Sequence, residues 1–173
     1  MPRNVEIKAR VADLAALALR AAAIADKGPI EIAQDDTFFR CDTGRLKLRQ
    51  FADGQGELIY YRRPDQQGPK ESFYIVSRTS TPDALRESLA LSNGVIGRVK
   101  KQRTLFLAGR TRIHLDRVEN LGDFLELEVE LAEQEPTDEG VKVAHEIMRA
   151  LGVEPSQLVE GAYLDLLAQA RLA

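Results

Sequence analysis

Charged residues spaced two apart recur along this chain, and they restrict its fold more than any other feature of the sequence. Alternate residues of a β-strand point to the same side, so each set projects from one face while the residues between its members, apolar in every set except at Gln102, cover the other. The sets are Glu6 with Lys8, Lys47 with Arg49, Lys101 with Arg103, Arg112 with His114 and Asp116, and Glu126 with Glu128 and Glu130. Several basic strands and one very acidic strand predict a polar interior that holds a polyanion together with metal ions.

Length and charge bound the size of the fold and the kind of anion it can bind. A chain of 173 residues, 44% of them hydrophobic, is long enough for one domain with a real core and short for two, so residues 1–173 are expected to form a single domain. The formal net charge of −3 argues against the broad positive field that nucleic-acid binding requires, and no nucleic-acid partner is expected. Any anion site must therefore be local.

Cysteine content and the amino terminus indicate the compartment. Cys41 is the only cysteine, so neither an internal disulfide nor a cysteine zinc cluster can form, which fits a reducing environment. The segment Met1–Asn4 leads into a strand pattern without the apolar stretch of a signal peptide. No segment approaches the ~20 apolar residues of a membrane span. We expect a soluble, cytoplasmic protein without a membrane partner.

Eight segments have the composition of strands and are separated by turn signals. They cover residues 4–10, 32–40, 45–51, 58–63, 72–77, 96–107, 111–118 and 124–131. The sequence Asp53-Gly54-Gln55-Gly56 between the third and fourth segments is typical of a hairpin loop. Eight strands that are mostly joined by short turns can close into an antiparallel barrel, which has no exposed edge.

Four further segments are predicted to be helical. They cover residues 13–25, 81–91, 137–151 and a stretch from Pro155 to about residue 170. The Lys27–Pro29 sequence is expected to end the first helix, and Thr81 is expected to cap the second, with Pro82 at its first position. The expected fold class is therefore α+β, a closed eight-stranded antiparallel β-barrel braced by a few α-helices. Helices outside a closed barrel could support a homodimer.

The alternating basic residues admit two interpretations. Alternating charge also marks the solvent face of ordinary amphipathic strands, and for any single strand this explanation is equally good. Taken together, the strands favour a bound anion, since like charges on neighbouring strands repel unless an anion lies between them. A polyphosphate would supply it, with arginine binding phosphate oxygens in bidentate fashion and lysine acting as a point charge. The residues concerned are Lys47, Arg49, Lys101, Arg103 and Arg112.

The acidic strand indicates a metal site. Glu126, Glu128 and Glu130 share one face, and carboxylates that cannot neutralise each other suit a hard divalent cation such as Mg²⁺ or Mn²⁺, which often bridges to phosphate. Glu6 could complete the cluster if its strand lies alongside. Glu130 by itself is better explained as a solvated surface charge.

The order and spacing of these motifs identify a resemblance to a known family. The motifs are Val5-Glu6-Ile7-Lys8, the basic pairs, Arg112-Ile113-His114-Leu115-Asp116 and the acidic segment Leu121–Glu128. They resemble the CYTH superfamily, also called the triphosphate tunnel enzymes, over nearly the whole chain, from Asn4 to the Tyr163–Leu167 segment. The resemblance implies an eight-stranded antiparallel barrel whose polar bore holds a triphosphate and a divalent metal, Mg²⁺ or Mn²⁺.

The resemblance also implies roles for individual residues. It assigns phosphate binding to Lys8, Lys47, Arg49, Arg63, Lys101, Arg103 and Arg112, metal binding to Glu6, Glu126 and Glu128, and catalysis to Lys8, Lys101 and Arg103. Arg45 is a further candidate for phosphate binding. Arg62 is an alternative to Arg63 for phosphate binding, because the sequence does not determine which of these two neighbours faces the bore.

Two positions depart from the family pattern. The opening motif of the family is Glu-x-Glu-x-Lys, and Asn4 stands at its first glutamate, where it offers a carbonyl oxygen but no charge. Members similar to thiamine triphosphatase often carry a tyrosine where this chain has Phe38, and that tyrosine, with a basic partner, is thought to assist hydrolysis. This mechanism of hydrolysis is therefore in doubt here.

Three functions remain open from the sequence. The first is a class IV adenylate cyclase, which converts ATP to cyclic AMP and pyrophosphate, and the resemblance to the bacterial cyclase-like branch favours it. The second is a thiamine triphosphatase or an inorganic tripolyphosphatase, which hydrolyses the terminal phosphate. Both need charge neutralisation and in-line positioning, so the tunnel motifs do not separate them. The third is a polyphosphate-binding or nucleotide-binding module without catalysis, which would gain nothing from the acidic strands.

Other combinations of residues are weaker candidates. Ser72, His114 and Asp116 have the residue types of a hydrolase triad, but Ser72 lacks the glycines of a nucleophile elbow. We expect His114 to be a hydrogen-bonded barrel residue and His145 to lie on a helix surface. Tyr60 and Tyr61 are expected to be packing residues, although one of them could face the bore.

Overall fold

A closed β-barrel is the central element of the computed structural model, which describes residues 2–172. Its strands are β1 (Arg3–Arg10), β2 (Lys27–Phe39), β3 (Arg45–Phe51), β4 (Gly56–Arg62), β5 (Lys70–Thr79), β6 (Val95–Ala108), β7 (Thr111–Val118) and β8 (Gly122–Leu131). Around the barrel they follow the order β1-β5-β4-β3-β2-β6-β7-β8, and every neighbouring pair, including β8 with β1, is antiparallel. The predicted fold class is confirmed.

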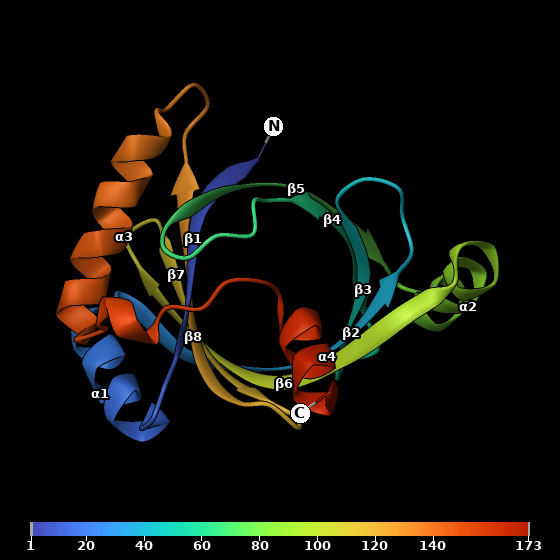
Figure 1. Cartoon of the computed structure of the whole chain (residues 1–173), viewed down its shortest axis with the longest axis horizontal. Coiled ribbons are helices and arrows are strands. Elements are labelled where there is room, and N and C mark those ends of the chain that lie inside the picture. The colour runs from blue at the N-terminus through green and yellow to red at the C-terminus, as the bar shows by residue number, and fades with distance from the viewer. Residues whose placement is uncertain (1, 173) are drawn as a thin grey trace.

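Four α-helices and one short 3₁₀ helix lie outside the barrel wall among the described residues (Figure 1). They are α1 (Leu14–Ile24), α2 (Pro82–Asn93), α3 (Thr137–Leu151), η1 (Pro155–Gln157) and α4 (Tyr163–Leu172). Helix α3 lies against β1 and β8 with α1 beside it, whereas α2 lies on the opposite side, near β2 and β3. Over residues 2–172, no helix is long and apolar enough to cross a membrane.

The main hydrophobic core lies outside the barrel wall, beneath α1 and α3. Ile7, Ile113 and Leu127 are fully buried there, and they pack with Leu17 of α1 and Met148 of α3. These strand residues alternate with the charged residues of β1, β7 and β8, so burial of the apolar face against the helices turns the charged face inward. The two-residue alternation of apolar and charged residues therefore produces a polar bore with an apolar layer outside it.

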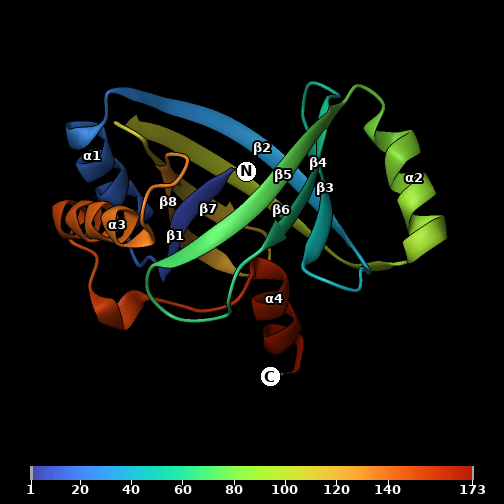
Figure 2. The same ribbon diagram turned by 90° about the horizontal axis from the view of Figure 1, so that it is seen from above.

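A second apolar cluster occupies one end of the bore. Phe38, Val99 and Phe124 pack there with Tyr163 and Leu167 of α4. The rings of Phe124 and Tyr163 meet edge to face with centroids 5.1 Å apart. Figure 2 shows α4 projecting from this end of the barrel. The C-terminal helix therefore covers one end of the bore.

The predicted helix after Pro155 is wrong in one respect, because it is interrupted. The short η1 ends at Gln157, and the next residues are extended because they pair with β1: Leu158 bridges Ala9, and Val159 N–H donates to the Lys8 carbonyl at 3.0 Å. Backbone pairing with β1 thus overrides helix propensity at residues 158–162. The interruption carries Tyr163 to the end of the bore.

Two local predictions near helix ends are also corrected. The sequence Lys27–Pro29 does not form a break, since it lies inside β2, and α1 ends earlier, at Ile24. Gly28 fits there because its φ is +114° and a Cβ atom would lie 2.6 Å from the Leu105 carbonyl oxygen of β6. Thr81 precedes α2 as predicted, but its side chain makes no capping hydrogen bond.

Candidate functional site

A cavity of about 880 Å³ fills the bore, and all eight strands contribute to its wall. Among the described residues, eight Lys or Arg and five Asp or Glu side chains line it, an excess of three positive charges. The ten residues assigned to the site from the sequence all lie on this wall: Glu6, Lys8, Lys47, Arg49, Arg63, Lys101, Arg103, Arg112, Glu126 and Glu128. Their roles in binding and catalysis stay predictions.

Asp36 of β2 is the centre of the most basic part of the cavity. Its buried carboxylate receives two hydrogen bonds of 2.8 Å from Arg49 and lies 3.1 Å from Lys47 Nζ and 3.2 Å from Lys101 Nζ. Burial raises the pKa of Asp36, but Arg49, Lys101 and Lys47 outweigh it and hold the pKa well below its usual range. The sequence alone predicted that a bound ligand would supply the anion between the basic strands. In the structure, the Asp36 carboxylate of the protein itself already lies between them.

The charge of Lys47 is sensitive to this environment. Burial lowers the pKa of Lys47 to about 7, because Asp36 only partly offsets the loss of water and the repulsion from Arg49 and Lys101. Its Nζ atom also lies 5.5 Å from the centroid of the Phe38 ring. The phenyl ring of Phe38 therefore lies beside Lys47, at the position where members similar to thiamine triphosphatase often carry a tyrosine.

Arg103 of β6 is bound by two carboxylates. It donates hydrogen bonds of 2.7 and 2.8 Å to Asp116 of β7 and a third, of 2.9 Å, to Glu126 of β8. The Tyr163 hydroxyl donates to the same Asp116 carboxylate at 2.8 Å. Asp116 and Tyr163 thus position Arg103 and connect it to α4, a role that the sequence did not reveal.

Lys8 of β1 lies between the acidic strand and the C-terminal segment. Its Nζ atom is 3.3 Å from Glu126, donates to the Gly161 carbonyl at 3.0 Å, and lies 4.0 Å from the centroid of the Tyr163 ring. Burial lowers its pKa to about 8 despite the adjacent Glu126 carboxylate.

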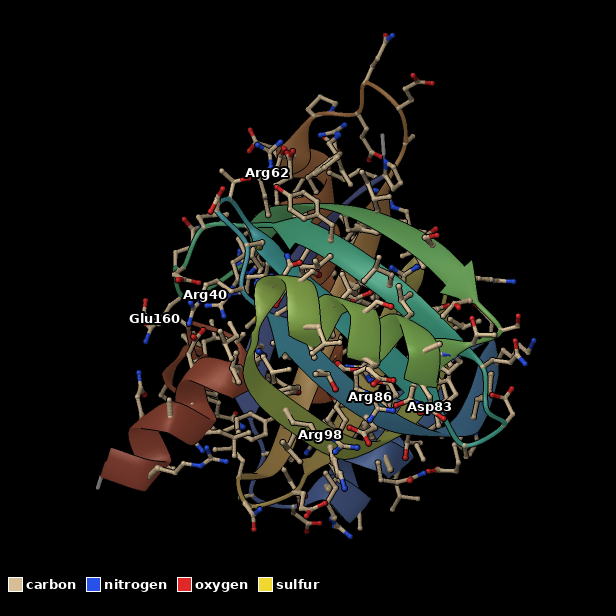
Figure 3. All side chains as sticks on the ribbon, turned by 90° about the vertical axis from the view of Figure 1, so that its right-hand side faces the viewer. Arg40, Arg62, Asp83, Arg86, Arg98 and Glu160 are labelled. Carbon is tan, nitrogen blue, oxygen red and sulfur yellow. The ribbon has the colours of Figure 1, made fainter. Side chains whose placement is uncertain are left out.

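Glu6 lies opposite Glu128 in the β1–β8 ladder, as the metal hypothesis requires. Its carboxylate, however, accepts a 2.5 Å hydrogen bond from Arg63. Burial, together with the negative charges of Glu128 and Glu126, raises the pKa of Glu6 despite Arg63. The alternative between Arg62 and Arg63 is decided by position, since Arg63 lines the cavity and Arg62 lies on the outer surface (Figure 3).

Arg112 of β7 joins two acidic residues of β8. Its Nη2 atom lies 2.8 Å from Glu128, and its Nη1 atom donates to Glu130. The side chain of Glu130 is 53% exposed, in keeping with its interpretation as a surface charge. Arg45 lies outside the cavity wall and pairs with Asp165 of α4 at 2.6 Å.

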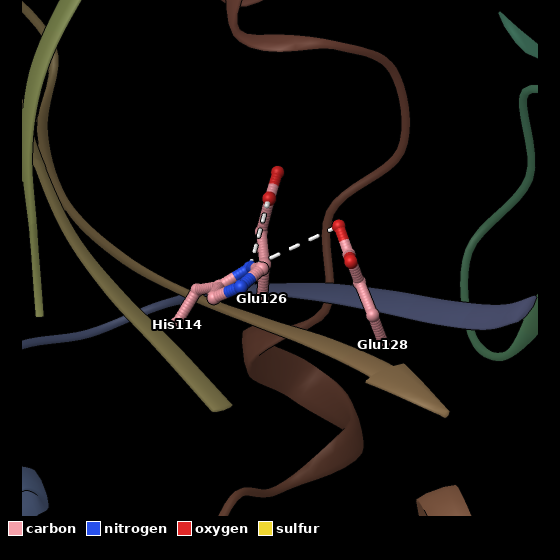
Figure 4. Close-up of side chains that lie close together, drawn as sticks. All are labelled: His114, Glu126 and Glu128. Atoms are coloured by element: carbon pink, nitrogen blue, oxygen red, sulfur yellow. Dashed lines mark ion pairs between the residues drawn. The ribbon is translucent and has the colours of Figure 1, made fainter. Parts of the chain in front are cut away.

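His114, Glu126 and Glu128 form the cluster shown in Figure 4. The Nδ1 atom of His114 lies 3.8 Å from Glu128 Oε1 and 4.0 Å from Glu126 Oε2, and one ligand atom from each residue lies within 4.8 Å of the others. Burial and the nearby Arg103 charge lower the pKa of His114 to about 4, so the imidazole is neutral at neutral pH. These three side chains could hold a divalent metal.

The expectation that His114 is a hydrogen-bonded barrel residue is wrong for Nδ1. This buried atom has no hydrogen-bond partner within the part of the chain that the structure describes. The Ser72 hydroxyl has no partner there either, and Asp116 is bound by Arg103 and Tyr163. Ser72, His114 and Asp116 therefore form no hydrolase triad. The buried Oδ1 atom of Asn4 on the cavity wall likewise lacks a partner among residues 2–172.

Apolar side chains line the part of the cavity distant from α4. They include Ile32, Phe51 and Leu105, each further along its strand from α4 than the charged residues of that strand. Tyr61 faces the cavity as well, whereas Tyr60 does not and its hydroxyl lies 3.5 Å from Thr43. At this end of the cavity the apolar side chains therefore lie beside charged ones, namely Glu57, Arg78 and Arg112.

Comparison with known proteins identifies the family. The model of the CYTH domain matches residues 2–163, and the chain belongs to this family. The chain matches no curated protein sequence at a significant level. The predicted resemblance is thus confirmed.

Solved structures share the fold at low sequence identity. A protein from Pyrococcus horikoshii OT3 is 24% identical, with a TM-score of 0.84 over 95% of this chain and 99% of that chain. A candidate adenylate cyclase from Vibrio parahaemolyticus is 18% identical, with a TM-score of 0.79 over 95% and 97% of the two chains. A candidate adenylyl cyclase from Hippeastrum, described as having a dominant triphosphatase activity, is 15% identical, with a TM-score of 0.68 over 96% and 95%.

Proposed function

We propose that this protein is a divalent-metal-dependent enzyme that binds a nucleoside or other organic triphosphate in the bore and converts ATP to cyclic AMP and pyrophosphate. The observation that carries the proposal is the arrangement of buried cations around one cavity, opposite the acidic face of β8. Such preorganised cations stabilise the charge that develops on phosphate oxygens without reorganisation at the moment of reaction.

The basic residues would bind the triphosphate in two groups. Lys47, Arg49 and Lys101 surround Asp36, and each amine or guanidinium retains hydrogen-bond donors that the carboxylate does not use. Lys8 and Arg103 lie beside Glu126, and Arg63 and Arg112 complete the wall. Lys8, Lys101 and Arg103, to which the family resemblance assigns catalysis, are the proposed catalytic residues.

Glu126 and Glu128, with Glu6 opposite, are the proposed carboxylates of the metal site. The unpartnered Nδ1 atom between two carboxylates supports a cation here, because a buried acceptor is otherwise costly. When bound, Mg²⁺ or Mn²⁺ would neutralise charge on the phosphate oxygens and help to orient the leaving group. Arg103 and Arg112 would keep the carboxylates in place.

One feature of the bore favours an organic triphosphate over bare tripolyphosphate, and another favours cyclisation over hydrolysis. Ile32, Phe51 and Leu105 offer an apolar surface on which an organic group can rest, which bare tripolyphosphate would not use. Phe38 places a phenyl ring beside Lys47, where a tyrosine hydroxyl would assist water attack. The ribose 3′-hydroxyl of a bound ATP, held in line with the α-phosphorus, would then be the nucleophile.

A second candidate function is hydrolysis of thiamine triphosphate or tripolyphosphate. It is supported by the Hippeastrum protein that shares the fold, which is described as having a dominant triphosphatase activity. A third candidate, a binding module without catalysis, is disfavoured by the buried carboxylates, which weaken simple anion capture.

One assay separates these functions. The purified protein would be incubated with Mg²⁺ or Mn²⁺ and with ATP, thiamine triphosphate or tripolyphosphate, and the products would be resolved chromatographically. Cyclic AMP with pyrophosphate is the expected result from ATP, and Glu126→Gln should abolish it while the protein stays folded. Orthophosphate release would select the hydrolase, and the absence of any product would favour the binding module.

A further inference from the structure

Within residues 2–172, His114 is the buried histidine of the bore, and two carboxylates face it. The residue is only 4% exposed, and its Nδ1 atom has no hydrogen-bond partner among residues 2–172. That atom faces Glu126 and Glu128 in Figure 4. A buried nitrogen is rarely left without a partner, and its position between two carboxylates suits a cation that all three side chains can bind.

We infer that His114 Nδ1, Glu126 and Glu128 together form a three-ligand metal site that binds first-row transition-metal ions, such as Mn²⁺ and Co²⁺, more tightly than Mg²⁺. The inference deepens the proposed function, on whose metal assignment it rests. It adds a nitrogen ligand to a site otherwise made of carboxylates. Imidazole suits transition metals, whereas Mg²⁺ prefers oxygen ligands and retains much of its water.

The distances are compatible with a shared ion. Two ligand atoms that each lie about 2.1 Å from one metal can be at most about 4.2 Å apart. The Nδ1 atom lies 3.8 Å from Glu128 Oε1 and 4.0 Å from Glu126 Oε2, and all three ligand atoms fall within 4.8 Å. Only a small inward adjustment of the two carboxylates is required.

The neighbouring cations leave one oxygen of Glu128 available but engage both oxygens of Glu126. Arg112 binds Oε2 of Glu128, so that Oε1 is the oxygen directed towards His114. Lys8 approaches Oε1 of Glu126, and Arg103 donates to Oε2. Partners of this kind orient metal ligands and tune their basicity. A metal would compete with Arg103 for one oxygen of Glu126, and the second contact of Arg103, with Asp116, would hold the guanidinium in place.

Glu6 is less well placed than His114 as the third ligand. Although it lies opposite Glu128, its carboxylate is drawn to Arg63 by a 2.5 Å hydrogen bond. Among the described residues, the group whose ligand atoms come close enough to share an ion contains His114 and excludes Glu6. Direct coordination is therefore assigned to His114, and Glu6 is left to act through Arg63 or through water.

The test uses the full chain with Mn²⁺ and needs no turnover. Pulsed electron paramagnetic resonance of the Mn²⁺ complex should show coupling to an imidazole ¹⁴N nucleus. The chain contains only two histidines, and His145 is exposed on α3, which makes His145→Gln a matched control. In the His145→Gln variant, His114 is the remaining histidine, and labelling it with ¹⁵N should convert the ¹⁴N coupling to a ¹⁵N coupling. This assigns the coupling to His114 without a His114 variant, which could fail to fold.

Substitution then measures the contribution to affinity. His114→Gln should abolish the nitrogen coupling and weaken Mn²⁺ binding, measured by calorimetry, by at least about tenfold, since even outer-shell changes cost 10- to 100-fold. Mg²⁺ binding should change less, and Glu6→Gln should keep the coupling. Lack of nitrogen coupling in the wild-type complex, or its persistence in His114→Gln, would overturn the inference. Nitrogen coupling without turnover of any triphosphate would instead reject the proposed function alone.

Discussion

Arg49 and Asp36 face each other across β2 and β3 inside the barrel, joined by two hydrogen bonds of 2.8 Å. Lys47 and Lys101 approach the same carboxylate. The inner part of the bore is therefore preorganised for an anion by a carboxylate that belongs to the protein. A triphosphate would enter a site whose cations are already positioned, so that little of its binding energy is spent on ordering side chains.

Asp36→Asn should destabilise the free protein and increase its dependence on ligand. Removing the charge leaves three buried cations without their anion, and breaking a buried ion pair typically costs about 3–5 kcal/mol. Denaturant unfolding should show a loss of this size, and added tripolyphosphate should restore more stability in the variant than in the wild type. Equal stabilisation of both proteins by the ligand would contradict the proposed role of Asp36.

Tyr163→Phe should loosen the attachment of α4 without removing its ring from the apolar cluster. The hydroxyl donates a 2.8 Å hydrogen bond to the buried Asp116 carboxylate, and such bonds to charged groups contribute about 1.5–3 kcal/mol. Tyr60→Phe is the matched control, because the Tyr60 hydroxyl meets only Thr43, at 3.5 Å. The free energy of unfolding should fall in the first variant and stay nearly constant in the second; equal changes would show that the Asp116 contact is unimportant.

Phe38→Tyr should shift the products towards orthophosphate. The new hydroxyl would lie near Lys47, whose Nζ atom is 5.5 Å from the present ring centroid, and the pair could position a water for attack. Phe73→Tyr, on the outer face of β5, serves as the control. The measurement is the ratio of orthophosphate to cyclic AMP formed from ATP. A ratio that is the same in both variants would argue that position 38 does not influence the choice of nucleophile.

Triphosphate binding should take up protons at slightly alkaline pH. A lysine with a pKa of about 7, such as Lys47, is mostly uncharged at pH 8, and a bound polyanion raises the pKa and restores the charge. Affinity should consequently fall as the pH rises from 6 to 9. Calorimetry in buffers of different ionisation enthalpy should detect an uptake of up to about one proton from this residue, and Lys47→Arg, which stays charged, should reduce it. Uptake unchanged in this variant would assign the proton to another group.

The fold was predictable because its information is local and repeated. In β1, β3, β7 and β8, each apolar residue between two charged ones fixes which face points outward, and the two-residue spacing of charges placed nine of the ten predicted residues, all except Arg63, in one cavity. Alternation fails where neighbouring residues are alike. Asp35 and Asp36 are consecutive acids, and only the structure shows that Asp36 faces the bore and Asp35 binds Arg98 on the outside.

The remaining features depend on contacts distant in sequence. The interruption at residues 158–162 results from pairing with β1, and local helix propensity does not report it. The role of His114 depends on two glutamates of β8, which the antiparallel pairing of β7 with β8 brings within 4.0 Å of its Nδ1 atom. Its position in the Arg112–Asp116 alternation was a signal that it faces inward, but not that its nitrogen would be left without a hydrogen bond.

The central claim, that the bore binds a triphosphate, is tested most directly by calorimetric titration of tripolyphosphate into two neighbouring lysine variants. Lys101 points into the cavity and approaches Asp36, whereas Lys100 is exposed on the outer surface of the same strand. At low salt, Lys101→Ala should weaken binding at least about tenfold, because it removes a buried charge-assisted hydrogen bond. Lys100→Ala should bind like the wild type. Equal affinities of the two folded variants would contradict the account.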